Sequence, residues 1–255
     1  MKAMRLLFRT LLVLAFASRV DAAGFAMSDN FTIFTPAYPT QQDAEAYAHE
    51  VLQSAETWRS EIAKQWLGEE LPPGVGQTTV NVSFSEEQDS GLTWAKDNPR
   101  RKYHTLYLTT TPDRALGSTL AHEMVHIVLA TRFPHPQRLA AWIEEGIASS
   151  YDDGPRQATR QRILAWIVKT ENWPDVAELL ISPNMASRDK TAYATASSLT
   201  AFLLSRGDKR TLLEFGQYAN KAGWDAALSK YYRIRSTADL QRSWQQWVHQ
   251  SPSLP

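Results

Sequence analysis

Short stretches in which apolar and polar residues alternate mark the first half of the chain. Residues 31–36 (FTIFTP), 79–84 (TVNVSF) and 105–109 (TLYLT) alternate in this way. A period of two is typical of a strand that is buried on one face only. We therefore predict strands in these three segments, with residues 91–95 (GLTWA) as the candidate for a fourth.

A helical spacing of apolar residues covers most of the remaining chain. Between residues 41 and 66 apolar side chains recur every three or four positions, until segment 71–74 (LPPG) ends the pattern. After Pro112 the pattern predicts helices at residues 113–131, 138–151, 156–169, 189–206, 208–219, 224–231 and 237–249. Strands first and helices afterwards indicate an α+β fold. We expect one domain at 23–255, with a β-containing lobe at about 30–112 and a helical lobe at about 113–250.

Residues 1–22 have the pattern of a secretory signal. Basic residues precede a short apolar core at 11–17, and the small residues at 20–22 (VDA) offer a cleavage site. The apolar core is shorter than the roughly 20 residues that a membrane-spanning helix needs. We therefore expect an exported protein, periplasmic or secreted, that keeps no stable membrane anchor after cleavage.

Composition narrows the chemistry that this chain can perform. The 255 residues include no cysteine, which excludes disulfides, thiolate nucleophiles and metal sites with Cys ligands. Lys and Arg together number 27, as do Asp and Glu, so no basic surplus favours a nucleic-acid partner. Any metal ion must therefore be held by the six histidines and the carboxylates.

The sharpest chemical feature is the segment 122–126 (HEMVH), which lies in the predicted helix 113–131. His122 and His126 are four residues apart, so both imidazoles lie on one helix face and reach one metal ion. Glu123 is placed to act on a metal-bound water without ligating the metal. Two partly exposed helix histidines are the alternative interpretation. The apolar residues around them favour the metal, because buried histidines are costly unless something satisfies them.

A catalytic zinc takes three protein ligands and keeps a fourth position open. The next predicted helix offers two carboxylates, Glu144 and Glu145, in segment 142–148 (WIEEGIA). A short turn between the helices brings either one within reach of the histidines. A solvated helix face is the alternative interpretation, which the apolar neighbours disfavour. Helical periodicity alone does not choose between the two glutamates.

The segment HEMVH, followed by 142–146 (WIEEG), resembles the zinc motifs of the gluzincin metallopeptidases of the peptidase MA-like superfamily. The resemblance implies a zincin-like fold: a small mixed β-sheet with a helix, then a mostly helical lobe, with the zinc helix at their junction. It also implies one Zn²⁺ per chain, held by His122, His126 and Glu145. Glu123 is then the general base.

The same resemblance implies a tyrosine that stabilises the developing oxyanion. Tyr193, at the start of an apolar helix, resembles that residue, and Tyr151 is the competing candidate. The chain departs from the thermolysin branch at Ser149, where that branch has an aspartate that orients a zinc histidine. Asp152 and Asp153 lie nearby as alternatives.

We therefore expect a zinc metallopeptidase that hydrolyses a peptide or protein substrate, with Glu123 moving the proton of a zinc-activated water. Residues 105–109 are the candidate for an exposed strand edge that pairs with the substrate. The alternative function is a zinc-binding envelope scaffold without turnover. Glu123 argues against it, because a structural zinc site needs no base and usually has four protein ligands.

Overall fold

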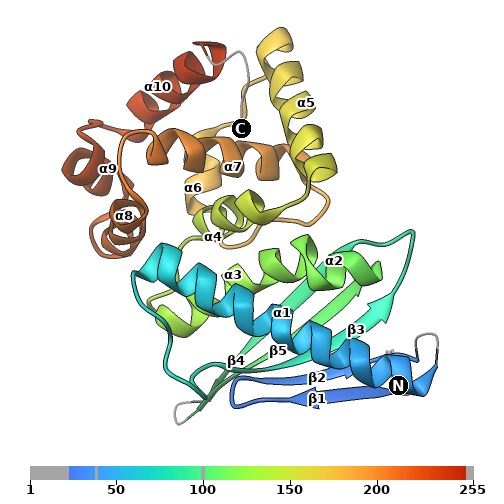
Figure 1. Ribbon diagram of the computed structural model, residues 1–255. Helices are drawn as coiled ribbons and strands as arrows, with labels where there is room; N and C mark the ends of the chain where they lie inside the picture. Colours follow the sequence, from blue (N-terminus) through green and yellow to red (C-terminus); the bar gives the residue numbers. More distant parts are fainter. Residues whose placement is uncertain (1–22, 38–39, 99–100, 251–255) are drawn as a thin grey trace, which may run out of the picture.

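The computed structural model describes residues 23–37, 40–98 and 101–250. They form two lobes, one built on a β-sheet and the other made of helices alone (Figure 1). About 61% of the structure is helical, and five strands form one mixed sheet, so the predicted α+β class is confirmed. The predicted signal segment 1–22 lies outside the described residues. Of the described helices, none is long and apolar enough to cross a membrane.

The sheet has the strand order β1-β2-β3-β5-β4, and the bounds are β1 Gly24–Met27, β2 Phe31–Thr35, β3 Gln77–Phe84, β4 Ser90–Asn98 and β5 Arg101–Thr110. Strands β2, β3 and β5 are parallel to one another, while β1 and β4 are antiparallel to their neighbours. All four predicted strands are confirmed. β1 escapes the alternation pattern because its four residues are too few to establish a period.

The position of β5 corrects one expectation about the sheet edge. Segment 105–109 belongs to β5, which lies between β3 and β4, so the prediction that it forms an edge is wrong. β4 runs antiparallel to β5 along its whole length and is the edge strand on that side. Alternation identifies a segment as a strand, but it carries no information about which neighbour pairs with it.

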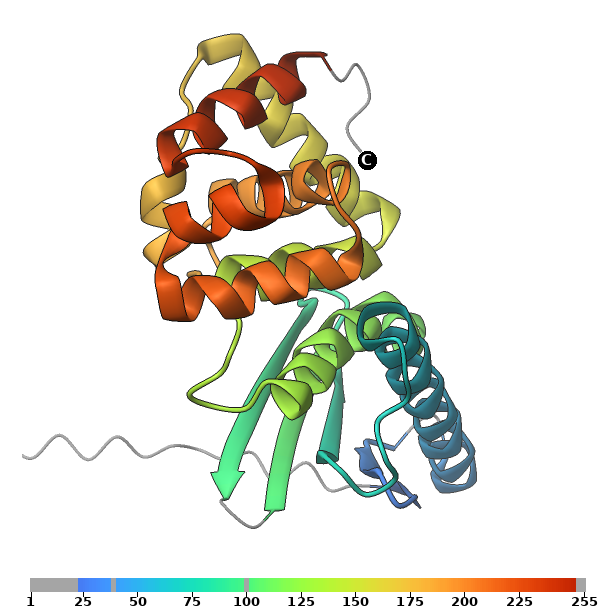
Figure 2. The ribbon, with the colours of Figure 1, turned by 90° about the vertical axis from the view of Figure 1, so that its left-hand side faces the viewer.

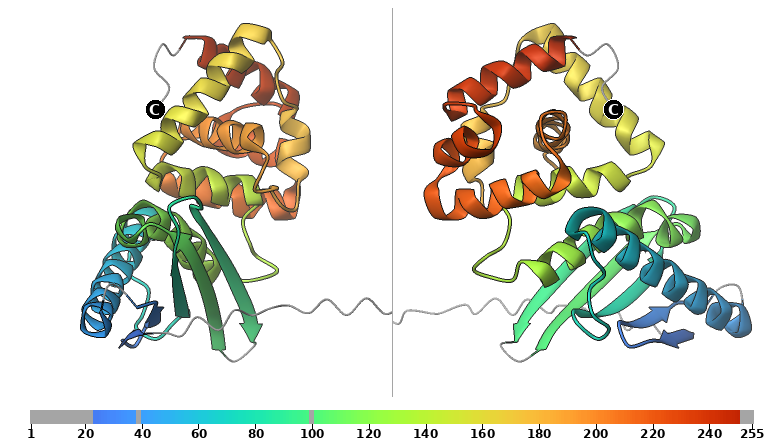
Figure 3. Two further views of the ribbon diagram at one scale, coloured as in Figure 1. Left: turned by 90° about the vertical axis from the view of Figure 1, so that its right-hand side faces the viewer. Right: turned by 60° about the vertical axis from the view of Figure 1, so that its left-hand side comes forward.

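Two helices cover one face of the sheet. α1 (Gln41–Leu67) and α3 (Ser118–Arg132) pack on this face, and the opposite face carries no helix among the described residues (Figures 2 and 3). The inward side chains of the central strands are at most 1% exposed beneath the helices; they are Val80, Val82, Leu106 and Leu108. α3 is therefore held between the sheet and the helical lobe, which fixes the position of its side chains.

The predicted helix 113–131 is interrupted at Gly117. The structure has a short α2 (Pro112–Leu116), then Gly117 at φ −114° and ψ −118°, and then α3. The Leu116 carbonyl accepts a hydrogen bond from Trp58 Nε1 at 3.2 Å instead of continuing the helical ladder. The prediction of one unbroken helix is wrong here because this partner lies 58 residues away in the sequence.

The helical lobe contains α4 Ala141–Ala148, the 3₁₀ turn η1 Ser149–Tyr151, α5 Gly154–Thr170, α6 Val176–Ile181, α7 Lys190–Leu204, α8 Lys209–Ala222, α9 Trp224–Tyr232 and α10 Thr237–Gln250. The other predicted helices are confirmed, although segment 138–151 forms a shorter helix that ends in η1. The six-residue α6 escapes the pattern because it is barely longer than one turn.

Helix α7 runs through the middle of the helical lobe, with α4, α5, α8 and α10 around it (Figure 3). Trp142 from α4 and Trp244 from α10 are fully buried on this assembly. The indole nitrogen of Trp244 donates to Ser198 Oγ at 3.0 Å, so its polar group is satisfied. Trp244 therefore belongs to the core.

Gly146 lets α4 and α7 approach one another closely. A Cβ atom at this position would lie 2.0 Å from Thr200 Oγ1 and 2.7 Å from the Ala196 carbonyl oxygen. Both distances are far below van der Waals contact, and one of the two atoms is backbone. The residue after Glu145 must therefore be glycine for α4 to keep this position on α7.

We predict that Gly146→Ala lowers the free energy of unfolding by about 1–3 kcal/mol, because α4 must shift to make room for the methyl group. Chemical denaturation followed by circular dichroism measures the change. Gly154→Ala is the matched control, since nothing lies within 4 Å of a Cβ at the start of α5. Equal stability of the two variants would contradict the close contact between α4 and α7.

Candidate metal centre

Helix α3 presents the HEMVH segment at the junction between the lobes. The side chains of His122 and His126 are 13% and 14% exposed. Their neighbours Leu120, Met124 and Ile127 are buried in the core. The other sides of the helix are packed into the core, so the two imidazoles face α4.

Glu145 of α4 meets both imidazoles. Its Oε2 atom lies 3.5 Å from His122 Nε2 and 3.7 Å from His126 Nε2. Each of the three residues offers a ligand atom, and these atoms lie within 4.8 Å of one another. The structure therefore brings together the three residues that the family resemblance implies as metal ligands.

Glu144 has a different environment, although it is equally close in sequence. Its Oε2 lies 3.6 Å from His126 Nδ1, on the far side of that ring, and accepts a hydrogen bond from Arg138 at 3.2 Å. The side chain is buried and paired, so it does not belong to a solvated helix face. Between the two glutamates, it is Glu145 that faces the Nε2 atoms.

The donor set fits a zinc ion. Among the described residues no donor forms a hydrogen bond to Glu145 Oε2, although this oxygen is buried. Such an atom is costly unless it has a partner, and a cation supplies one. Ligand atoms around a tetrahedral zinc at roughly 2.0–2.2 Å are about 3.3–3.6 Å apart, close to the separations from Glu145 to the two histidines. Two imidazoles and one carboxylate leave a fourth position open.

His122 is oriented from behind by Asp152. The His122 Nδ1 atom lies 3.0 Å from Asp152 Oδ1, and Arg156 and Arg160 both donate to the same carboxylate. Burial lowers the pKa of His122, but the contacts with Asp152 and Glu145 outweigh it and raise that pKa to about 10. Asp152 thus fixes the ring so that Nε2 is turned towards Glu145.

Ser149 does not take the orienting role. Its hydroxyl is buried and has no hydrogen-bond partner in the described part of the chain. Asp152, one of the two alternatives suggested by the sequence, supplies the carboxylate from the end of the η1 turn. Asp153 instead caps α5 and pairs with Arg114 at 2.9 Å.

The ion-pair network around Asp152 leaves no recognisable pattern in the sequence. Arg156 bridges Asp152 and Asp89, at 3.0 and 2.7 Å, and Arg114 also binds Asp89 at 3.1 Å. Thr110 and Thr119 each donate to Asp89 at 2.7 Å. Since these residues come from separate elements, no local spacing reveals the network.

The edge strand β4 holds Glu123 in place. Thr93 Oγ1 donates to Glu123 Oε2 at 2.6 Å. A Cβ at Gly91 would lie only 2.2–2.4 Å from the Glu123 side chain, so only glycine lets the strand pass this closely. Glu123 is 7% exposed and is fixed by these two contacts beside the histidines.

The two tyrosine candidates lie in different places. Tyr193, in the first turn of α7, lines a pocket of about 500 Å³ together with His122 and Glu123. Burial, followed by the nearby Glu145 carboxylate, raises the pKa of Tyr193 well above its ordinary value, so the hydroxyl stays protonated. Tyr151 is engaged elsewhere: its hydroxyl accepts from Trp66 Nε1 and donates to Gln65.

Comparisons with known proteins add no further assignment. No protein-family model matches the chain, and no match is found among the curated proteins or the solved structures.

Zinc binding should release protons from this centre. At neutral pH the pKa of about 10 keeps His122 protonated in the metal-free protein, whereas only the neutral imidazole binds a metal. Zinc affinity should therefore rise with pH and level off above a pH of about 10. Calorimetric titration at pH 7 in buffers of different ionisation enthalpy measures the protons released, which we expect to be on the order of one per zinc.

Two variants serve as controls for the zinc titration. Metal analysis should find about one zinc per chain in the parent protein and almost none in His122→Ala. Asp152→Asn should bind zinc roughly 10–100-fold more weakly and release fewer protons, because the carboxylate that raises the His122 pKa is gone. Equal zinc content in the parent and His122→Ala would contradict the assignment of the ligands.

Proposed function

We propose that this protein is an exported zinc metallopeptidase with a zincin-like fold, related to the gluzincins. The observation that carries the proposal is the convergence of His122, His126 and Glu145 at the junction of the lobes, with Glu123 beside them. Three ligands from two neighbouring helices leave one side of the centre open to a pocket. An open position and an adjacent carboxylate are features of a catalytic zinc site rather than a structural one.

A bound zinc ion would supply a Lewis acid that polarises the scissile carbonyl and lowers the pKa of an attacking water towards ~7. Glu123 accepts the proton of that water and delivers it to the leaving amine. The hydrogen bond from Thr93 engages Oε2 of Glu123, and we assign the proton transfer to the other oxygen, Oε1.

Tyr193 is placed to assist the same step. Tyr193 lines the same pocket as Glu123, and its raised pKa keeps the proton that a hydrogen-bond donor needs. A donor aimed at a developing negative charge stabilises the transition state more than the ground state. We propose that Tyr193, and not Tyr151, donates to the carbonyl oxygen of the substrate.

The edge strand β4 provides a surface for an extended substrate. It pairs with β5 on one side, and among the described strands none covers its other side. The strand also passes directly over Glu123 through Gly91 and Thr93. A peptide added along β4 by backbone hydrogen bonds would therefore lie beside the proposed base.

Glu123→Gln tests the proposed peptidase activity. The variant should keep its zinc, because Glu123 is not a ligand, and should cleave peptides about 10²–10⁴-fold more slowly. The measurement is the rate of cleavage of a broad library of quenched fluorescent peptides, with metal content and melting temperature as controls. A parent protein that binds zinc but cleaves no library member would support the scaffold alternative instead.

Thr93→Val tests how Glu123 is positioned. Removing the hydroxyl should lower kcat about tenfold, because it leaves the base without its hydrogen bond of roughly 1.5 kcal/mol, while KM changes little. Thr93→Ser keeps a donor and should restore most of kcat. If Thr93→Val stays as active as the parent while Thr93→Ser loses activity, the methyl packing of Thr93 matters and its hydrogen bond does not.

A further inference from the structure

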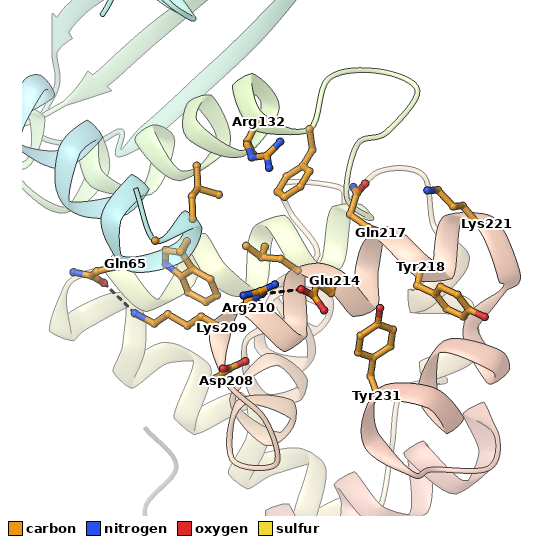
Figure 4. Close-up of a pocket in the computed structure, with 15 residues that line it drawn as sticks. Gln65, Arg132, Asp208, Lys209, Arg210, Glu214, Gln217, Tyr218, Lys221 and Tyr231 are labelled. Carbon is orange, nitrogen blue, oxygen red and sulfur yellow. Dashed lines mark hydrogen bonds and ion pairs between the residues drawn. The ribbon is translucent and has the colours of Figure 1, made fainter. Parts of the chain in front are cut away.

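A second pocket, of about 790 Å³, lies between the lobes away from the metal centre (Figure 4). One wall is the carboxyl end of α1, and Arg132 and Phe133 at the end of α3 lie beside it. The other wall is α8, with Tyr231 of α9 next to it. This groove shares no lining residue with the pocket around His122, so it is a separate feature of the molecule.

The groove carries basic groups that have no acidic partner. Four basic and two acidic residues line it. The acids are already engaged: Asp208 caps α8 by accepting from Thr211 N at 2.7 Å, and Glu214 pairs with Arg210 at 2.8 Å. The three remaining cations form no ion pair within the described residues; they are Arg132, Lys209 and Lys221.

Aromatic rings line the groove together with these cations. The lining aromatic residues are Trp66, Phe133, Tyr218 and Tyr231. Lys209 Nζ lies 4.9 Å from the centre of the Trp66 ring and donates to Gln65 at 3.1 Å. Figure 4 shows Arg132 and Lys209 entering the groove from opposite lobes, with Tyr231 further along it. The groove therefore offers positive charge and flat apolar surface side by side.

We propose that this groove is a docking site for an acidic peptide segment of a partner protein. Carboxylates of the segment pair with Arg132, Lys209 and Lys221, and its apolar side chains pack on the aromatic rings of the groove. A polynucleotide fits less well, because the carboxylates of Asp208 and Glu214 would repel its regularly spaced phosphates. A peptide can place neutral residues opposite these two acids. The docking site does not depend on the proposed hydrolysis.

The partial burial of Lys209 favours the binding of an anion in the groove. The pKa of Lys209 is lowered because burial removes its ammonium group from water. A carboxylate brought next to the ammonium replaces part of the lost hydration. The same contact would join α8 of one lobe to a peptide that also touches α3 of the other.

Fluorescence anisotropy with a labelled peptide of glutamates and tyrosines tests the proposal. The Glu123→Gln variant is the background in every measurement, so that hydrolysis does not consume the probe. We expect saturable binding that weakens as salt is added. A peptide with every glutamate replaced by glutamine should bind at least tenfold more weakly. Equal binding of both peptides would overturn the proposal, and so would tighter binding of a labelled single-stranded oligonucleotide.

A charge reversal locates the binding site. Arg132→Glu combined with Lys221→Glu should weaken binding of the acidic peptide at least tenfold. The matched control is Lys169→Glu combined with Arg235→Glu, on α5 and in the turn before α10, which changes the net charge equally at exposed positions outside the groove. Equal loss in both double variants would show unspecific attraction and overturn the docking site. Melting temperatures confirm that both double variants fold.

Discussion

The structure depends on keeping two imidazoles and a carboxylate together in a buried space between the lobes. His122 and His126 come from a helix that packs on the sheet, while Glu145 comes from the helical lobe. Separating the lobes would leave these polar groups without one another. Closing the lobes removes these groups from water, and their mutual contact offsets that loss of hydration, so the contact links the positions of the lobes.

Charged residues on the far side of His122 stabilise this buried arrangement. In the metal-free protein Asp152 and Glu145 favour the protonated form of His122. The positive charge of the imidazolium then balances the negative charge of these carboxylates. Two arginines hold Asp152, and the burial that would raise its pKa is outweighed by these partners and by His122, so the pKa falls well below its ordinary value. Under the proposed function, zinc and protons would compete for one site that the ion pairs around Asp152 have already organised.

The sequence predicts the features of this centre that depend on neighbouring residues. It predicts few of the contacts between residues that are far apart in the chain. Periodicity identifies the elements, and the spacing within 122–126 places two imidazoles on one face of a helix. Resemblance to a family selects Glu145 as the third ligand, and in the structure this glutamate lies near the Nε2 atoms of both histidines. The sequence leaves the Asp152 contact undecided and gives no sign of the Thr93 contact, because each contact joins residues that are 30 positions apart along the chain. The interruption at Gly117 has the same cause, a contact from another helix.

The register of β4 decides what surrounds Glu123. Gly91 and Thr93 point towards the carboxylate, whereas Leu92 and Trp94, on the opposite face of the strand, are 53% and 57% exposed. Successive side chains point to opposite faces, so a slip of one residue would bring Leu92 onto Glu123 and leave Thr93 facing solvent. The proposed base would lose its donor and meet a bulky apolar side chain where only glycine fits. Pairing with β5, from Ser90↔Thr109 to Asn98↔Arg101, prevents this slip. The sheet therefore sets the environment of the proposed base through its hydrogen-bond register, and the edge that a substrate would use is the same strand that holds this base.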